Sequence, residues 1–348
     1  MKTLLQLPKS LLYGLALPLF ALNGWLLLVI FQYFESLITI IVTATLLSFI
    51  LDYPVRLLQK IRINRSISIL ITILFVGSGL AIIGIILVPL VIEQLNQLLE
   101  KLPSWLSSGS EQFKGLEAWA KSRNFPINIS NLGADLLGRL STQVQQFGGQ
   151  ILGSLFSALN RVLDILLTIV LTFYLLLQGQ ELWDSLFQLL PPDLAIKIRP
   201  AIGRTFHNYF VGQISVATIM GLVITTAFLI LQIPFGLLFG LGVGVMAIFP
   251  FGAALSIATI GFLVALKSIW LGIQVLVVAV IIEQIVENAI APRLLGEFTG
   301  LNPALILLSL LVGAKVAGFL GLILAVPLAS LIKKLVAIYQ NNKVEYKV

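Results

Sequence analysis

Long apolar blocks dominate the chain and are separated by short polar segments. Typical blocks run from Ser36 to Leu51, from Ile67 to Ile92 and from Leu163 to Leu177. The apolar residues in them do not recur only at every third or fourth position, as on the surface helix of a soluble protein, but fill all sides of a helix. Blocks of this length and uniformity predict helices that cross a lipid bilayer.

Two kinds of structure pair every backbone N–H and C=O group inside a bilayer, namely helices and closed barrels. Strands of a membrane barrel alternate apolar and polar residues over about ten positions, and these blocks do not alternate. The pattern therefore predicts an all-α integral membrane protein, a polytopic bundle of about eight transmembrane helices.

The order of the blocks divides the chain into three parts. Residues 1–92 hold predicted transmembrane helices 1 to 3, the first at about 11–34. Residues 93–157 form a polar segment, and residues 158–348 hold a C-terminal transmembrane bundle. The first half of the polar segment has leucines at helical spacing, which predicts amphipathic helices lying on the membrane or on the bundle; these are Leu95, Leu98, Leu99 and Leu102.

Prolines and serines predict breaks within that amphipathic segment. Pro103, the run from Ser107 to Ser110 and Pro126 each interrupt the helical pattern. A second group of leucines between positions 132 and 140 predicts another amphipathic helix beyond them.

Positive charge indicates the orientation of the chain. The segment from Asp52 to Arg65 is the densest cationic loop, with Arg56, Lys60 and Arg62 between its ends. Because cytoplasmic loops are rich in Lys and Arg, this loop is predicted to be cytoplasmic. The N-terminus is then cytoplasmic too, and the 93–157 segment is extracytoplasmic.

Two apolar runs in the C-terminal part are too short to cross the membrane in full. The runs at about 235–249 and 253–266 have a helical length of roughly 22 Å, against roughly 30 Å of hydrocarbon. Pro234 and Pro250 lie before them, and a proline within the membrane removes a backbone hydrogen bond and frees a carbonyl group. We expect these runs to be tilted, broken or re-entrant.

The last apolar block, from Ala304 to Ile332, is interrupted by glycines and by Lys315. Nine simple crossings would place the basic tail after this block outside the cell. Eight crossings plus one broken or re-entrant piece keep both termini cytoplasmic, which the distribution of positive charge favours. We expect the interruption in 233–252 or in 304–332.

Composition supports a membrane protein and excludes other classes. Of the residues, 58% are hydrophobic and 11% are charged, whereas soluble domains are about a quarter charged. The chain has no cysteine and one histidine, so we expect no metal or other cofactor. The net charge of +7 fits anionic lipid headgroups rather than nucleic acid.

Two motifs of energy coupling and catalysis are absent from the sequence. There is no G-x-x-x-x-G-K-[ST] phosphate-binding loop and no H-E-x-x-H zinc motif. We therefore expect neither direct use of ATP nor enzymatic activity.

A polar cluster near the C-terminus carries the candidate chemistry. Glu283 and Glu287 lie four residues apart on a predicted helix and share one face, with Gln284 beside Glu287 and Asn288 beside Gln284. A charged residue at mid-bilayer costs about 2.5–3.5 kcal/mol. Either the acids form a proton or cation site with Arg293 as counter-charge, or they lie at the cytoplasmic end of the helix and anchor it.

Lys315 and the glycines leave similar alternatives. Lys315 pairs with one of the two acids or lines a polar path, or else its side chain extends to the membrane interface. Gly236, Gly240 and Gly244 repeat a G-x-x-x-G spacing, which predicts either close helix packing or a substrate-facing role. Gln213 is predicted to be an interfacial polar residue.

Several motifs follow one another in a specific order along nearly the whole chain. They are Y-P-V-R-L-L at 53–58, I-P-F-G at 233–236, F-P-F-G at 249–252, E-Q-I-V-E-N-A-I-A-P-R-L-L-G at 283–296, L-N-P at 301–303 and L-A-V-P at 324–327. Together they resemble the AI-2E (autoinducer-2 exporter) family, also called PerM-like permeases.

The resemblance implies a bacterial inner-membrane protein of about eight spans. One branch of the family is assigned to export of the quorum signal autoinducer-2 and another to sodium/proton antiport. The motif positions carried over to this chain are Pro234, Gly236, Pro250, Gly252, Gln284, Glu287, Asn288, Pro292, Gly296, Pro303, Gly318, Gly321 and Pro327.

Three hypotheses about function stay open at this point. The first is a transporter that moves a small solute across the bacterial plasma membrane without ATP, beside the helix around Glu287. The second is a sodium/proton antiporter in which Glu283 or Glu287 exchanges protons for cations. The third is a membrane scaffold that binds partners through 93–157. Assembly into a homo-oligomer also stays open.

Overall fold

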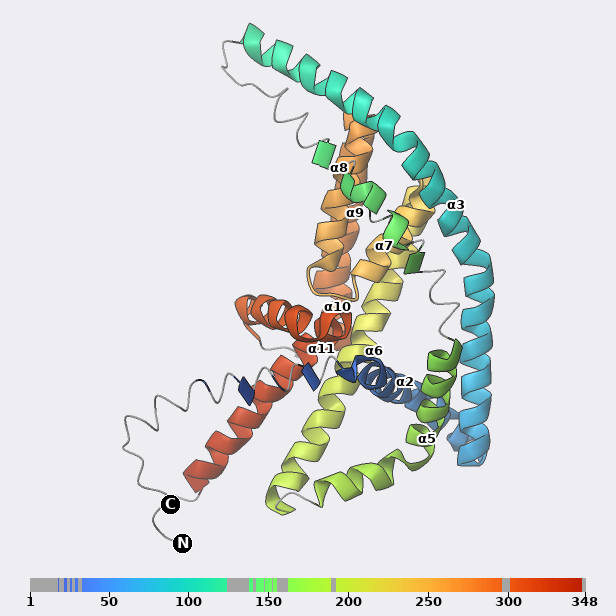
Figure 1. Cartoon of the computed structure of the whole chain (residues 1–348), viewed down its shortest axis with the longest axis vertical. Helices are drawn as coiled ribbons and strands as arrows, with labels where there is room; N and C mark the ends of the chain where they lie inside the picture. Colours follow the sequence, from blue (N-terminus) through green and yellow to red (C-terminus); the bar gives the residue numbers. More distant parts are fainter. Residues whose placement is uncertain are drawn as a thin grey trace.

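The computed structural model describes residues 33–123, 162–188, 192–295 and 301–345, with scattered positions between 18 and 30 and short stretches between 138 and 154. In these residues every regular element is a helix (Figure 1). Six of the described helices are long and apolar enough to cross a membrane, and two further apolar helices are shorter. The prediction of an all-α membrane protein is confirmed. The predicted span at 11–34 and the second amphipathic helix lie almost wholly outside the described residues.

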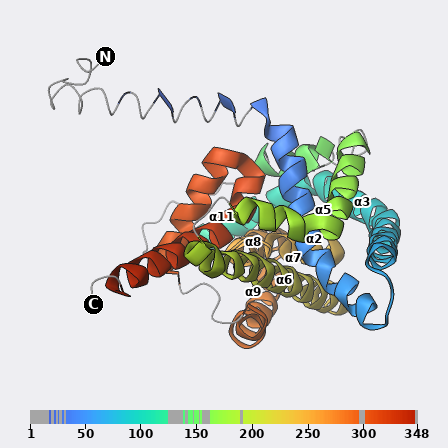
Figure 2. The ribbon, with the colours of Figure 1, turned by 90° about the horizontal axis from the view of Figure 1, so that it is seen from below.

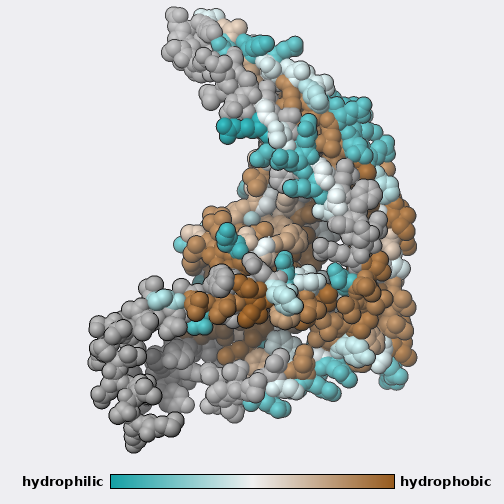
Figure 3. Space-filling view, viewed as in Figure 1, coloured by the Kyte–Doolittle hydropathy of each residue, from teal (hydrophilic) through white to brown (hydrophobic). Residues whose placement is uncertain are grey.

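The first helices form a lipid-facing unit. Helix α2 (Glu35–Lys60) packs beside α5 (Val162–Phe187), and α3 (Arg65–Ser122) begins against both. Large apolar side chains point outward from the first half of α3, where Phe75 is 78% exposed and Ile85 is 75% exposed. Surfaces of this kind are stable when lipid covers them. Figure 3 shows this apolar surface continuing over the lower part of the molecule.

Helix α3 is one unbroken helix, so the predicted breaks at Pro103 and in the serine run are wrong. It passes through Pro89 and Pro103 and ends at Ser122, curving along one edge of the molecule (Figure 1). The hydroxyl groups of Ser107 and Ser108 donate to carbonyls of the preceding turn and remain within the helix.

Tertiary packing explains why the proline does not end α3. The part of α3 after residue 93 was predicted to be an amphipathic helix. Its apolar face is buried in the main apolar core, against α7 and α8. A proline inside a helix costs about 3 kcal/mol, whereas each buried leucine contributes about 1.5–3 kcal/mol. Burial of several large side chains therefore outweighs the proline; these are Leu95, Leu98, Leu102 and Trp105.

The C-terminal bundle contains both short helices that the sequence predicts. Helix α6 (Pro192–Ile230) is followed by α7 (Gly236–Met246), α8 (Gly252–Lys267) and α9 (Ile269–Ile285). Helix α7 has 11 residues and α8 has 16, which confirms that these runs are short. Pro234 and Pro250 lie in the turns that precede α7 and α8, not inside a span.

Glycines allow α6 and α7 to pack closely, which confirms the packing interpretation of the G-x-x-x-G repeat. A Cβ atom added to Gly244 would lie 2.5 Å from the Cα atom of Gly221 on α6. A Cβ on Gly240 would overlap Thr225, and one on Gly236 would lie 3.1 Å from the Cβ of Phe228.

We expect Gly244→Ala to lower the free energy of unfolding by about 2 kcal/mol, because the methyl group would push two backbones apart. Gly242→Ala is the matched control on the same helix, since its Cβ would meet nothing within 4 Å. Alanine also favours a helix over glycine by about 1 kcal/mol. Thermal unfolding of the two variants in detergent should therefore shift in opposite directions, and equal shifts would contradict the packing model.

The last helix is broken in the predicted block. Helix α11 (Pro303–Glu345) has non-helical backbone at Ala317 and Gly318, where Gly318 has φ +53°. Gly313 and Gly321 approach so closely that a Cβ on either would overlap the other's carbonyl group. The chain therefore turns back on itself as a helical hairpin, whose two arms are visible in Figure 2.

Candidate functional site

Regular helix is interrupted at three places that converge beside the middle of α6 (Figure 1). One of these places is the turn between α7 and α8, and another is the tip of the α11 hairpin. The remaining one lies between them in sequence. The rings of Phe249 in that turn and Phe319 at that tip lie 5.5 Å apart in a T-shaped arrangement. This remaining interruption is a π-helix, η1 (Val286–Ile290), which contacts α6 together with the short α10 (Ala291–Leu295).

Pro292 lies just after the π-helix. A proline has no N–H group and its ring clashes with the carbonyl four residues earlier, here that of Asn288, which favours a wider turn at this point. The chain widens here, and the N–H of Ala291 donates to the carbonyl of Val286, five residues back. Single π-turns of this kind are frequent at functional sites. The sequence contained the signal in Pro292, but we expected only an ordinary helix here.

Two amide side chains stabilise this widened segment. The Nδ2 atom of Asn288 donates to the backbone oxygen of Gln284 at 2.8 Å and to its side-chain Oε1 at 2.9 Å. Asn288 does lie beside Gln284, as the spacing predicted. The backbone oxygen of Gln284, near the proline, is thus hydrogen-bonded within the motif itself.

The two acids present negative charge on the same stretch of helix. Glu283 is half-buried, whereas Glu287 is exposed, as are Gln284 and Asn288. Among the described residues no ion pair joins either acid to Arg293 or Lys315, and both of these cations are exposed. The structure brings the acids and amides together on α9 and η1 and places neither cation as a direct counter-charge.

Side chains from other helices fix both ends of α7 beside this site. Gln213 on α6 donates from Nε2 to the carbonyl of Ala247 at 2.6 Å. The Oε1 atom of Gln94 on α3 accepts from the N–H of Leu238 at 3.0 Å. Gln213, which the sequence predicts to be an interfacial polar residue, therefore caps the C-terminal end of α7. Its pairing depends on the fold, so no local sequence signal could have revealed it.

The remaining motif residues have structural positions. A Cβ on Gly252 would overlap the carbonyl of Met246, so the turn into α8 requires glycine. Pro303 begins α11, where the Oδ1 atom of Asn302 accepts from the N–H of Ala304 at 3.0 Å, a favourable start for a helix. Pro327 lies inside the second arm of α11. Gly296 lies outside the described residues.

Broken helices that meet near the centre of a polytopic helical bundle occur in many membrane transport proteins. Comparison with known proteins agrees with this class. The model of the AI-2E family of transporters matches residues 15–341, and the chain belongs to that family.

Three relatives illustrate how far the similarity extends. Putative transport protein sll0063 of Synechocystis sp. is 42% identical over 96% of this chain and 86% of its own length. Putative permease PerM of Escherichia coli is 24% identical over 90% of each chain. The AI-2 transport protein TqsA of Escherichia coli is 23% identical over 92% of this chain and 94% of its own. All three names describe transport, not catalysis.

Proposed function

We propose that this protein moves a small polar solute across the bacterial plasma membrane, without direct use of ATP, along a path beside η1. The observation that carries the proposal is the meeting of the α7–α8 turn, η1 and the α11 hairpin. Non-helical backbone at membrane depth is tolerated only where protein buries it or where it lines a water-filled cavity. Polar side chains on the same stretch of helix, including Gln284 and Glu287, favour a water-filled cavity.

Autoinducer-2 is the first candidate substrate, because one relative is named as an AI-2 transport protein. The relatives with higher identity are named only as transport proteins. Other small polar metabolites are therefore included in the test. We also propose that both termini are cytoplasmic, which the cationic segment from Arg56 to Arg65 supports.

Sodium/proton antiport is the second candidate function. It is favoured by the spacing of Glu283 and Glu287. Two carboxylates four residues apart on a helix repel each other and therefore attract a proton or a cation. Neither acid has a cationic partner among the described residues. The scaffold hypothesis stays a third candidate; α3 buries Leu98 and Trp105 against the bundle, so a partner would bind the other faces of this helix.

Reconstitution in liposomes tests the proposal. The purified protein should give uptake of autoinducer-2 or a related small polar metabolite faster than protein-free liposomes, with no ATP present. A parallel series measures sodium flux under an imposed pH gradient. Solute uptake without sodium flux supports the first function, and the reverse result supports the antiporter. Flux equal to that of empty liposomes in both series would exclude both functions.

A further inference from the structure

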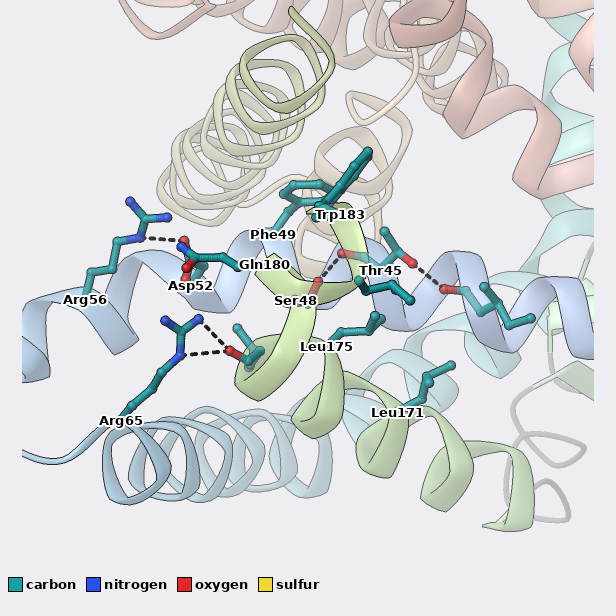
Figure 4. Close-up of a pocket in the computed structure, with 14 residues that line it drawn as sticks. Thr45, Ser48, Phe49, Asp52, Arg56, Arg65, Leu171, Leu175, Gln180 and Trp183 are labelled. Carbon is teal, nitrogen blue, oxygen red and sulfur yellow. Dashed lines mark hydrogen bonds and ion pairs between the residues drawn. The ribbon is translucent and has the colours of Figure 1, made fainter. Parts of the chain in front are cut away.

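A second polar site lies away from the three helix interruptions, in a pocket of about 530 Å³ between α2, the start of α3 and α5 (Figure 4). One end is charged and the other is apolar. Figure 4 shows Arg56 and Arg65 at the charged end, with Leu171 and Leu175 toward the other. The apolar wall comes from both long helices; it includes Ile41, Phe49, Leu171 and Leu175.

Arg65 is held in place at the charged end. Its Nε and Nη2 atoms donate to the backbone oxygen of Leu176 on α5, at 3.1 and 2.7 Å. The guanidinium group therefore spans from the first residue of α3 to α5. Its Nη1 atom has no partner among the described residues, and a guanidinium group offers donors in a rigid fork that suits phosphate oxygens.

Arg56 supplies a second guanidinium group on the same side. Its Nε atom pairs with Oδ2 of Asp52, one turn earlier on α2, at 2.6 Å. The side chain is 66% exposed, so its terminal nitrogens are accessible. Two arginines and one aspartate leave the charged end of the pocket positive. An anion is therefore the complementary ligand.

The position of the pocket decides what kind of anion fits. Its charged end lies where the apolar parts of α2 and α5 give way to polar sequence, and Trp183 lines it there. Tryptophan and arginine at this level of a membrane protein lie among lipid headgroups. The apolar wall continues from there along the membrane-spanning parts of both helices. A ligand that fills the pocket needs an anionic head and an apolar tail.

We propose that this pocket binds one anionic phospholipid, with the headgroup phosphate against Arg56 and Arg65 and an acyl chain along the wall formed by Ile41, Leu171 and Leu175. Basic pockets between transmembrane helices are known to hold anionic headgroups. The bound lipid would join α2, α3 and α5, which are the helices that flank the pocket. This site is separate from the proposed transport path.

Native mass spectrometry of the protein in detergent micelles tests the proposal, with phosphatidylglycerol as the titrant. We expect one tightly bound phosphatidylglycerol per chain. Arg56→Gln should weaken its binding about fivefold and Arg56→Gln/Arg65→Gln about twenty-fivefold, given a contribution of about 1 kcal/mol from each basic residue to headgroup binding. Lys60→Gln is the matched control, because it removes a charge from the same segment without lining the pocket, and it should change binding less than twofold.

Further arms identify the ligand. Zwitterionic phosphatidylcholine should bind at least fivefold more weakly, and millimolar inorganic phosphate should not displace phosphatidylglycerol. Displacement by inorganic phosphate would show a phosphate site without a lipid and overturn the proposal. Equal losses in Arg56→Gln and Lys60→Gln would overturn it as well. Arg56→Gln carries the test if the double variant does not fold, because Arg56 is exposed whereas Arg65 ties α3 to α5.

Discussion

Replacing Glu287 with glutamine is expected to lower the transport rate of the reconstituted protein by about tenfold, or about 1.4 kcal/mol in activation free energy. Glu287 is an exposed acid on the π-helix that precedes Pro292, next to the hydrogen-bonded pair of Gln284 and Asn288. In the proposed path this carboxylate supplies the negative charge that a passing solute or cation meets. Glutamine keeps the shape of the side chain and removes that charge.

Glu100→Gln is the control for this prediction, because it removes an exposed acid from α3, away from the site. It should leave the rate unchanged. Sodium flux under a pH gradient distinguishes the two proposed functions in the same variants. An antiporter loses proton-coupled sodium flux in Glu287→Gln or Glu283→Gln. An unchanged rate in Glu287→Gln, with either substrate, contradicts a path beside η1.

The second large effect is expected at the α11 hairpin. Gly321→Ala should lower the free energy of unfolding by about 3 kcal/mol, at the upper end of the cost of overpacking, and should stop transport. Its Cβ atom would overlap the carbonyl group of Gly313. Because the clash is with backbone, no side chain can rotate away. The arms must separate, and Phe319 then leaves Phe249.

Gly84→Ala is the matched control for the hairpin variant, since its Cβ would meet nothing within 4 Å on the lipid-facing part of α3. It should be at least as stable as the wild type, because alanine favours a helix over glycine by about 1 kcal/mol, and it should be fully active. Thermal unfolding in detergent and liposome flux measure the two effects separately. A stable, active Gly321→Ala protein would falsify the hairpin geometry described above.

The sequence predicted the fold class and the broken segments for physical reasons that act locally. Apolar blocks that fill every side of a helix have one stable environment, which is lipid. The number of residues between Pro234, Pro250 and Lys267 predicted the two short helices. The glycines of the last apolar block, together with the basic tail that follows it, predicted the break in α11. The glycine spacing in α7 likewise predicted its close contact with α6.

The parts that sequence reasoning missed depend on contacts between distant segments. Pro103 ends a helix by local rules, but burial of Leu102 and Trp105 against the bundle keeps α3 continuous. Gln213 and Gln94 became caps only because α6 and α3 lie at the two ends of α7. The pocket between α2 and α5 involves Arg65 and Leu176, which are 111 residues apart. No pattern within one segment could have paired them.

Accessibility of single cysteines tests the central claim most directly, because the chain has no cysteine of its own. Cysteine is placed at Glu287, on the proposed path, or at Ile285, an exposed apolar neighbour on α9, and each protein is treated in liposomes with a membrane-impermeant thiol reagent. We expect rapid labelling at position 287 that blocks the residual flux of that variant, and slow labelling at 285 that leaves its flux unchanged. Equal labelling at the two positions, or labelling at 287 that leaves the residual flux unchanged, would contradict a water-filled path beside η1.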